Sequence, residues 1–291
     1  MTLMAGQRGQ TKWRRVWPLI AGRVAVLLPL GLGLQMLDIG PLVILHYYAM
    51  FFVLAAPATF LSNRILLAVA GTLSLAGPAA YYLIERARPE WVVRYDPVTL
   101  TDPPALILRE LLFTGSYPAM VWMAPFLFGM WLGRRALNAG GTRIGLFLGG
   151  GIVAFLALVV GILSPNTGWW ALAAATPHSQ MCVWLIGGTA AATTLLAVCL
   201  SLTDLLGRFL WPLVAMGQLA LTAYVSHLLL LDAVPGVKSN TVESAFLAVG
   251  LFTLGVMLFA VVWRRRFQRG PLENVLRFPA YCFGRGFGPD R

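Results

Sequence analysis

The sequence predicts an all-α integral membrane protein, a polytopic bundle of about eight transmembrane helices. Hydrophobic residues make up 58% of the 291 positions and charged residues only 11%, whereas roughly one quarter of a soluble domain is charged. Apolar runs of about twenty residues, the length that crosses a bilayer core of ~30 Å, recur along almost the whole chain. Little of the chain is therefore left for a separate soluble domain.

Eight apolar runs define the expected spans of a transmembrane domain over residues 16–263. The runs cover 16–37, 41–60, 65–84, 116–133, 144–163, 179–201, 210–231 and 244–263. A cytoplasmic segment, 1–15, precedes this domain, and a basic cytoplasmic tail, 264–291, follows it. The first run follows basic residues, as in a signal peptide, but it is too long and lacks a small-x-small cleavage site. We expect it to remain as an anchor.

Basic residues orient the predicted spans. With a cytoplasmic N-terminus, most of the 22 Lys and Arg residues fall in inside segments and most of the 11 acids fall outside. The positive-inside rule then places both termini in the cytoplasm. The formal charge of +11 therefore reflects a lipid partner and not nucleic acid, which would need a water-facing basic patch. The longest outer loop, 85–115, either covers an outer cavity or is a solvated connector with an interfacial helix.

The sequence contains no pattern typical of a metal site. Cys182 and Cys199 lie inside apolar spans, where cysteine acts as a small packing residue. There is no HExxH motif, no CxxC pair and no Gly-rich phosphate loop. We therefore expect neither a bound metal nor a disulfide framework.

All three histidines fall in the predicted outer leaflet. At a rise of 1.5 Å per residue, His46, His178 and His227 each lie within roughly 8 Å of the outer boundary. Ionisable groups in a span are costly unless they face a cavity or pair with one another, which makes them functional candidates. Interfacial anchoring is the alternative. A neutral imidazole at this depth suits a general base, a nucleophile, a proton relay or a structural hydrogen bond.

We assign His227 and His178 as the candidate catalytic residues. His227 lies deeper in its span and has Tyr224 at i−3 on the same helix face. His178 follows a proline at a predicted helix start, where a polar cap is equally expected. Polar residues at the same depth complete the expected substrate-binding set: His46, Tyr117, Ser179, Tyr224 and Asp232.

Arginines gather on the predicted cytoplasmic side. Arg134 and Arg135 follow FGMWLG, and Arg269 stands in RRRFQRGPLE. Because guanidinium groups match phosphate oxygens, these three are candidates for binding the phosphates of a donor such as acyl-coenzyme A (acyl-CoA). Positive-inside anchoring and contact with anionic lipid are the competing explanation.

Four strings resemble, in order and spacing, the C-terminal two-thirds of the bacterial YeiB-type membrane family. They are TGSYPAMVWMAPFLFGMWLGRR (114–135), PHSQMCVWLIGGTAAATTLLAVCL (177–200), MGQLALTAYVSHLLLL (216–231) and RRFQRGPLENVLR (265–277). That family is similar in turn to the heparan-α-glucosaminide N-acetyltransferase-like proteins, which are transmembrane acyltransferases. The resemblance covers roughly residues 12–277, and its motifs are moderately specific.

The resemblance implies acyl transfer across a bacterial cytoplasmic membrane. The donor would be cytoplasmic acyl-CoA, and the acceptor an amine or hydroxyl of an extracytoplasmic envelope glycan or lipid. Recurrent positions of the family would be occupied by Tyr117, Gly129, Gly133, Arg134, His178, Ser179, Thr222, Tyr224, His227, Gly270, Pro271 and Glu273.

Family members usually begin with about three more helices, which carry an Asp and Arg-Gly signature, and the catalytic histidine of the acetyltransferases follows the first helix. This sequence starts beyond that region, so no residue here inherits that role from the resemblance. A truncated or inactive form, a partner membrane chain that supplies the missing part, and a homo-oligomer are the expectations that follow. Two other functions stay open: a small-molecule or lipid transporter, which Pro and Gly within spans allow, and a non-catalytic subunit of a larger complex.

Overall fold

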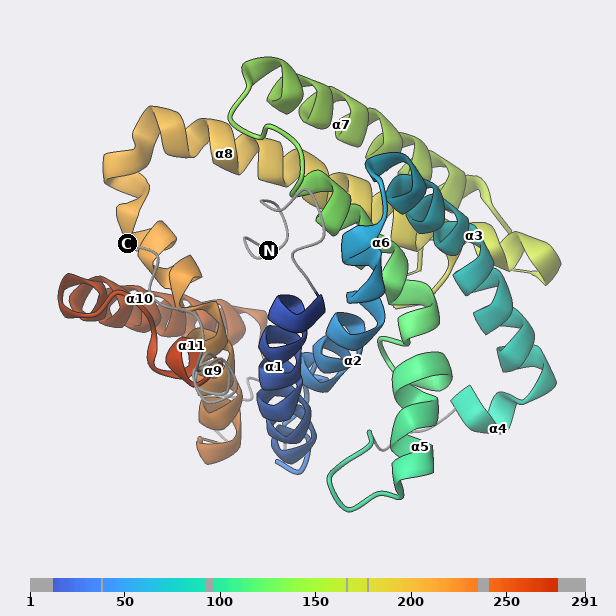
Figure 1. Ribbon diagram of the computed structural model, residues 1–291, viewed down its shortest axis with the longest axis horizontal. Coiled ribbons are helices and arrows are strands. Elements are labelled where there is room, and N and C mark those ends of the chain that lie inside the picture. The colour runs from blue at the N-terminus through green and yellow to red at the C-terminus, as the bar shows by residue number, and fades with distance from the viewer. Residues whose placement is uncertain are drawn as a thin grey trace. The chain divides into compact units, whose positions relative to one another are not determined.

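Helices are the only regular elements in the part of the chain that the structure, a computed structural model, describes (Figure 1). That part comprises residues 13–37, 39–92, 97–165, 167–176, 178–234 and 241–276. Five of these helices are long and apolar enough to cross a membrane. They are α1 (Trp13–Leu34), α3 (Asn63–Ala87), α7 (Gly140–Leu163), α8 (Cys182–Gln218) and α10 (Val242–Arg266). The chain is thus an all-helical protein with membrane-spanning helices.

Shorter elements connect these helices. They are α2 (Leu45–Ala55), η1 (Pro57–Phe60), α4 (Pro89–Val92), α5 (Pro104–Arg109), the π-helical turn η2 (Glu110–Thr114), α6 (Ala119–Leu132), η3 (Gly168–Ala173), α9 (Ala220–Ala233) and α11 (Pro271–Val275). The α5–η2 segment and α6 are bent by 60° about a short break and give a sixth span if they cross together. Eight spans and cytoplasmic termini stay predictions.

Two of the predicted spans differ from the helices in the structure. The run 41–60 contains α2, of only 11 residues, followed by the 3-10 turn that begins at Pro57. Proline lacks the N–H that an α-helix needs at this point, so the helix ends before it. The run 210–231 is divided between the end of α8 and α9, because Leu219 leaves the helical conformation with φ −108° and ψ 30°.

The described residues form two compact units, and each is described by itself. The first unit is built from the described residues of 50–98 and 102–205, and the second from those of 12–49, 99–101 and 206–291. The division within α8 falls at Leu206, where φ −120° and ψ 20° depart from helical values.

The core of the first unit lies between α3 and α6. At Gly77 the two backbones touch, since a Cβ there would strike the carbonyl oxygen of Met120 and lie 3.2 Å from the Cα of Val121. Around this contact the buried side chains of Tyr81, Tyr82, Val121, Ala124, Met181 and Leu185 form one apolar cluster. Only glycine permits so close an approach of two helices, and dispersion contacts between them replace a hydrophobic driving force in lipid.

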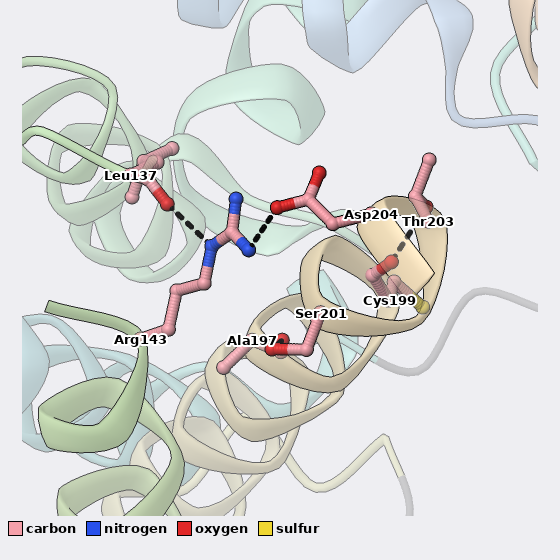
Figure 2. A network of polar contacts seen from close by, with 7 residues as sticks. All are labelled: Leu137, Arg143, Ala197, Cys199, Ser201, Thr203 and Asp204. Atoms are coloured by element: carbon pink, nitrogen blue, oxygen red, sulfur yellow. Dashed lines mark hydrogen bonds and ion pairs between the residues drawn. The ribbon is translucent and has the colours of Figure 1, made fainter. Parts of the chain in front are cut away.

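A polar network joins the start of α7 to α8 in the same unit. Figure 2 shows Arg143 between the carbonyl oxygen of Leu137, 2.8 Å from its Nε, and the carboxylate of Asp204, to which its Nη1 donates. The hydroxyls of Ser201 and Thr203 turn back onto carbonyls of their own helix. The Arg143 side chain is mostly buried while Asp204 is mostly exposed, and this pair joins the start of α7 to α8 just before the Leu206 bend.

The second unit contains two local packing contacts that matter for the site. Between α1 and α2, a Cβ at Gly31 would strike the backbone nitrogen of His46, so the helices meet there without a side chain between them. The buried Oε1 of Gln35 accepts the N–H of Val43 at 3.0 Å and closes the connection between these helices. Elsewhere in the unit, Ala215, Leu219 and Ala260 form a small core.

Candidate functional site

A short loop before α8 carries His178 and Ser179. His178 and Gln180 have φ values of 60° and 62°, the left-handed region that side chains other than glycine rarely adopt. Such a conformation costs on the order of 1–3 kcal/mol per residue and persists only where the surroundings enforce it. Two strained residues on either side of Ser179 therefore call for a structural cause.

Gln180 supplies that cause. Its side chain is only 4% exposed. The Oε1 atom accepts the indole N–H of Trp122 at 2.6 Å, and Nε2 donates to the carbonyl oxygen of Ser116 at 2.6 Å. These hydrogen bonds tie the loop to the α6 helix and to the turn before it. Because both bonds run to residues about sixty positions away, the sequence has no local pattern that predicts this role of Gln180.

The loop held by Gln180 places His178 beside the aromatic rings of Tyr117 and Trp122. The His178 ring is exposed and lies 6.4 Å from the Tyr117 ring in an edge-on arrangement, and Tyr117 in turn lies 5.3 Å from Trp122. The Ser179 hydroxyl accepts the N–H of Met181 at 3.4 Å. Two predicted substrate-binding residues, Tyr117 and Ser179, are thus brought together with one predicted catalytic residue. Their imidazole, phenol and hydroxyl groups can accept and donate protons to an incoming hydroxyl or amine.

A second group of predicted site residues lies on α9 in the second unit. The Tyr224 hydroxyl accepts the N–H of Ile44 at 3.2 Å, which places the start of α2 against α9. The half-buried His227 lies 6.2 Å from the Tyr224 ring and 5.8 Å from the Phe252 ring of α10. Asp232 lies half-buried in the last turn of α9 and has an interaction partner. His227 therefore stands in an aromatic setting.

Glu273 of α11 caps the N-terminus of α9. One carboxylate oxygen accepts the N–H groups of Leu221 and Thr222 at 2.8 and 3.0 Å, and the other accepts the Thr222 hydroxyl at 2.6 Å. The Thr222 hydroxyl oxygen also accepts the N–H of Leu272 at 3.2 Å. A carboxylate at a helix N-terminus satisfies orphan N–H groups and complements the helix dipole. The segments RGPLE (269–273) and LTAYVSH (221–227) thus meet in space, which the sequence alone did not predict.

Gly270 makes this cap possible. A Cβ at Gly270 would strike the Glu273 carboxylate and approach the Leu219 side chain to 2.9 Å. The Trp263 indole N–H donates to the carbonyl oxygen of Arg269 at 2.7 Å and fixes the preceding turn. The turn between α10 and α11 is therefore held through the Arg269 carbonyl oxygen, and the Arg269 residue is half-buried.

His46 is packed away from solvent. It is 1% exposed, and its Nδ1 has no hydrogen-bond partner among the described residues. A Cβ at Gly31 would lie 2.9 Å from Nδ1, so this nitrogen faces the backbone of α1. A protonated Nδ1 would be a buried donor without an acceptor, and we therefore assign the ring as neutral with its proton on Nε2. Such burial favours a structural role over contact with a substrate.

The three histidines divide between the two units. His178 belongs to the first unit, whereas His46 and His227 belong to the second. Tyr224 joins α9 to the chain two residues before His46. Convergence of all three histidines on one site stays a prediction.

Arg134 is enclosed by oxygen atoms. Its Nη1 donates to the carbonyl of Leu61 at 2.7 Å and to the Asn63 side chain at 3.2 Å, and Nη2 donates to the carbonyls of Ala58 and Thr59 at 3.2 and 3.1 Å. Burial lowers the pKa of Arg134, but a guanidinium in such surroundings stays charged. Because both Nη groups are engaged, a phosphate would find only Nε–H. The geometry favours a structural role for Arg134, in which its hydrogen bonds join η1 and α3 to the end of α6.

Arg135 stands in contrast to its neighbour. It is exposed, and its guanidinium carbon lies 5.2 Å from the centre of the Trp131 ring. This cation–π contact orients the side chain, and among the described residues its N–H groups have no hydrogen-bond partner, so they can bind an anion. Of the predicted phosphate-binding residues, Arg135 and Arg269 thus retain their side chains for a ligand.

The described residues contain no group of three or more His, Cys, Asp or Glu side chains that could hold a metal ion. The chemistry available at both groups of residues is that of imidazole, hydroxyl, phenol and carboxylate.

Comparison with known proteins supports one family. The chain matches no curated protein and no solved structure. A family model described as "Protein of unknown function (DUF418)" matches residues 131–282, more than half of the chain. The matched segment includes His178, Gln180, His227 and Glu273, whereas His46 and Tyr117 precede it. The chain belongs to the DUF418 family.

Proposed function

We propose that this protein is a membrane acyltransferase of the YeiB type, in which the loop of His178 and Ser179 receives the acceptor. The observation that carries the proposal is the pair of left-handed residues, His178 and Gln180, held by the buried Gln180 amide. Backbone strain of this kind gathers at sites where a side chain must be held in one orientation. The exposed imidazole beside Tyr117 is the group so held.

The chemistry is acyl transfer from a thioester. An acceptor hydroxyl or amine gives its proton to the His178 imidazole as its oxygen or nitrogen bonds to the acyl carbon. The carbon–sulfur bond breaks, the thiolate of coenzyme A takes up a proton, and the imidazolium returns its proton to water. In this proposal Tyr117 donates a hydrogen bond to the acceptor. His227, beside Tyr224, is the second candidate base, and its aromatic setting suits binding of a sugar or lipid acceptor.

The donor is acyl-CoA on the predicted cytoplasmic side. Arg269 of the second unit is the proposed phosphate contact, because Arg134 is committed to carbonyl oxygens. Eight spans with both termini in the cytoplasm, in the cytoplasmic membrane of a bacterium, are part of this proposal.

Transport is the second candidate. The 60° bend between the α5–η2 segment and α6, and the break at Leu206 within α8, give discontinuous helices of the kind found in transporters. Uptake of a solute or scrambling of lipid by the reconstituted protein would favour this function.

The decisive comparison uses protein reconstituted in vesicles with labelled acyl-CoA and envelope lipids. We expect His178→Gln to lower the rate of transfer at least about 100-fold, the contribution of a general base. Thr176→Ala, an exposed position of the same loop, serves as the control and should keep full activity. Equal rates for wild type and His178→Gln would remove His178 from the chemistry, and a loss in His227→Ala alone would assign the role to α9.

A further inference from the structure

A cavity of about 390 Å³ lies among α3, α6, α7 and α8 of the first unit. This volume is within the range of sites that hold a small-molecule ligand. Its wall includes Gly71, Phe128, Trp131, Gly145, Gly149 and Ala190. Apart from three hydroxyl groups and the indole N–H of Trp131, the side chains of the wall are apolar. It is separate from the His178 loop.

The hydroxyls in the wall offer no free proton to a ligand. Ser74 donates to the carbonyl of Ala70 at 2.9 Å, and Thr189 and Thr193 donate to the carbonyls four residues before them at 2.7 and 2.8 Å. A polar occupant would lose hydrogen bonds to water and gain few in return. The cavity therefore suits an apolar chain.

Glycines create this space. A Cβ at Gly71, Gly145 or Gly149 would meet nothing within 4 Å, so these three positions border open volume. Gly150 differs, because a Cβ there would lie 2.5 Å from the Thr194 hydroxyl at the contact of α7 with α8. Close helix packing explains Gly150, whereas it does not explain the other three.

One end of the cavity is cationic. Trp131 lines the wall, and the exposed Arg135 lies over its ring. Arg134 follows at the end of α6, and its contact with Asn63 places the exposed Arg64 of α3 at the same end of the bundle. Arginines at the end of an apolar cavity complement an amphiphile with an apolar chain and an anionic head.

We infer that the cavity holds one acyl chain of an anionic phospholipid, whose headgroup lies beside Arg135. The surrounding bilayer supplies such chains at high concentration. Lipid tails are as apolar as the cavity wall, so the chain alone gains little on entry. The arginines must then provide the preference, which favours anionic over zwitterionic lipid.

The test uses the full chain in lipid nanodiscs with phospholipids that carry a photoreactive diazirine in one acyl chain. Phosphatidylglycerol is compared with phosphatidylcholine, and crosslinked peptides are mapped by mass spectrometry. We expect wild type to be labelled on α3 and α7, with phosphatidylglycerol preferred about fivefold, the effect of one arginine near a lipid headgroup. Arg135→Glu should abolish that preference.

The matched variants fill space within one helix. Gly145→Leu with Gly149→Leu should reduce labelling of the wall to background, whereas Gly151→Leu should not, because Gly151 also borders open space but lies outside the wall. Thermal unfolding checks that each variant is folded, and Gly71→Leu replaces the double variant if that one fails to fold. Equal labelling in filled and control variants would overturn the inference. Equal labelling by both lipids, or displacement by long-chain acyl-CoA at lower concentration than by phosphatidylglycerol, would overturn the choice of lipid.

Discussion

At the scale of single residues, two side chains that bear no catalytic group fix the candidate site. Gln180 holds two strained residues through bonds to Trp122 and Ser116. The Arg134 guanidinium donates hydrogen bonds to four oxygen atoms of residues 58–63. In both cases one polar side chain makes hydrogen bonds to more than one partner, so its loss leaves several polar groups unsatisfied.

We expect Gln180→Leu to destabilise the protein by about 2 kcal/mol, since the Trp122 indole and the Ser116 carbonyl lose their partners. The His178 loop should then relax from its left-handed conformation. Thermal unfolding in detergent measures the loss, and protease sensitivity of the loop reports the relaxation. Thr176→Ala should shift neither measurement. An unfolding midpoint for Gln180→Leu equal to that of wild type would contradict the anchoring role.

Arg134→Lys separates a structural arginine from a phosphate site. The two Nη nitrogens of Arg134 donate to four oxygens, whereas lysine has a single ammonium nitrogen and cannot reach all of them. We therefore expect a loss of about 1–3 kcal/mol in unfolding free energy. Arg135→Ala, at the exposed neighbour, should change stability by less than about 0.5 kcal/mol. If Arg134 instead binds the donor, Arg134→Lys would leave the unfolding transition in place and weaken binding of acyl-CoA.

At the scale of helices, the contact of α11 with α9 links the tail to the helix of Tyr224 and His227. The Glu273 carboxylate satisfies two backbone N–H groups that α9 itself leaves open. The tail thus caps the start of α9. The same helix contacts the segment before α2 through Tyr224.

Glu273→Gln should therefore weaken the start of α9. The amide keeps one acceptor but loses the charge, and a lost cap costs about 0.5–2 kcal/mol. Hydrogen exchange of the Leu221 and Thr222 amides should rise in the variant while that of α3 does not. Glu243→Gln, an exposed acid in the first turn of α10, is the control. Unchanged exchange at Leu221 would refute the cap.

At the scale of the whole molecule, the sequence predicts the helical membrane class and its long helices well. The runs 144–163 and 244–263 correspond to α7 (140–163) and α10 (242–266). An unbroken apolar stretch that crosses a bilayer must satisfy its backbone hydrogen bonds internally, which favours an α-helix. The breaks at Pro57 and Leu219 were missed, since apolar composition continues across them.

Site residues were harder to predict than helices. Tyr117 was predicted to bind substrate and His178 to act in catalysis, and their rings lie 6.4 Å apart. The sequence alone does not predict this contact, because the two residues are far apart in the chain. The hydrogen bonds of Gln180 and Arg134 join segments 58 to 76 positions apart in the chain. A single sequence has no local pattern that predicts such contacts.

The central claim is acyl transfer across the membrane, and vectorial transfer tests it most directly. Labelled acyl-CoA is supplied only on the face that carries Arg135, with the acceptor lipid or glycan on the opposite face of sealed, oriented vesicles. We predict acylated acceptor on the opposite face with wild-type protein and its loss with His178→Gln. Acylation absent from wild-type vesicles, or equal in the two proteins, would contradict the account.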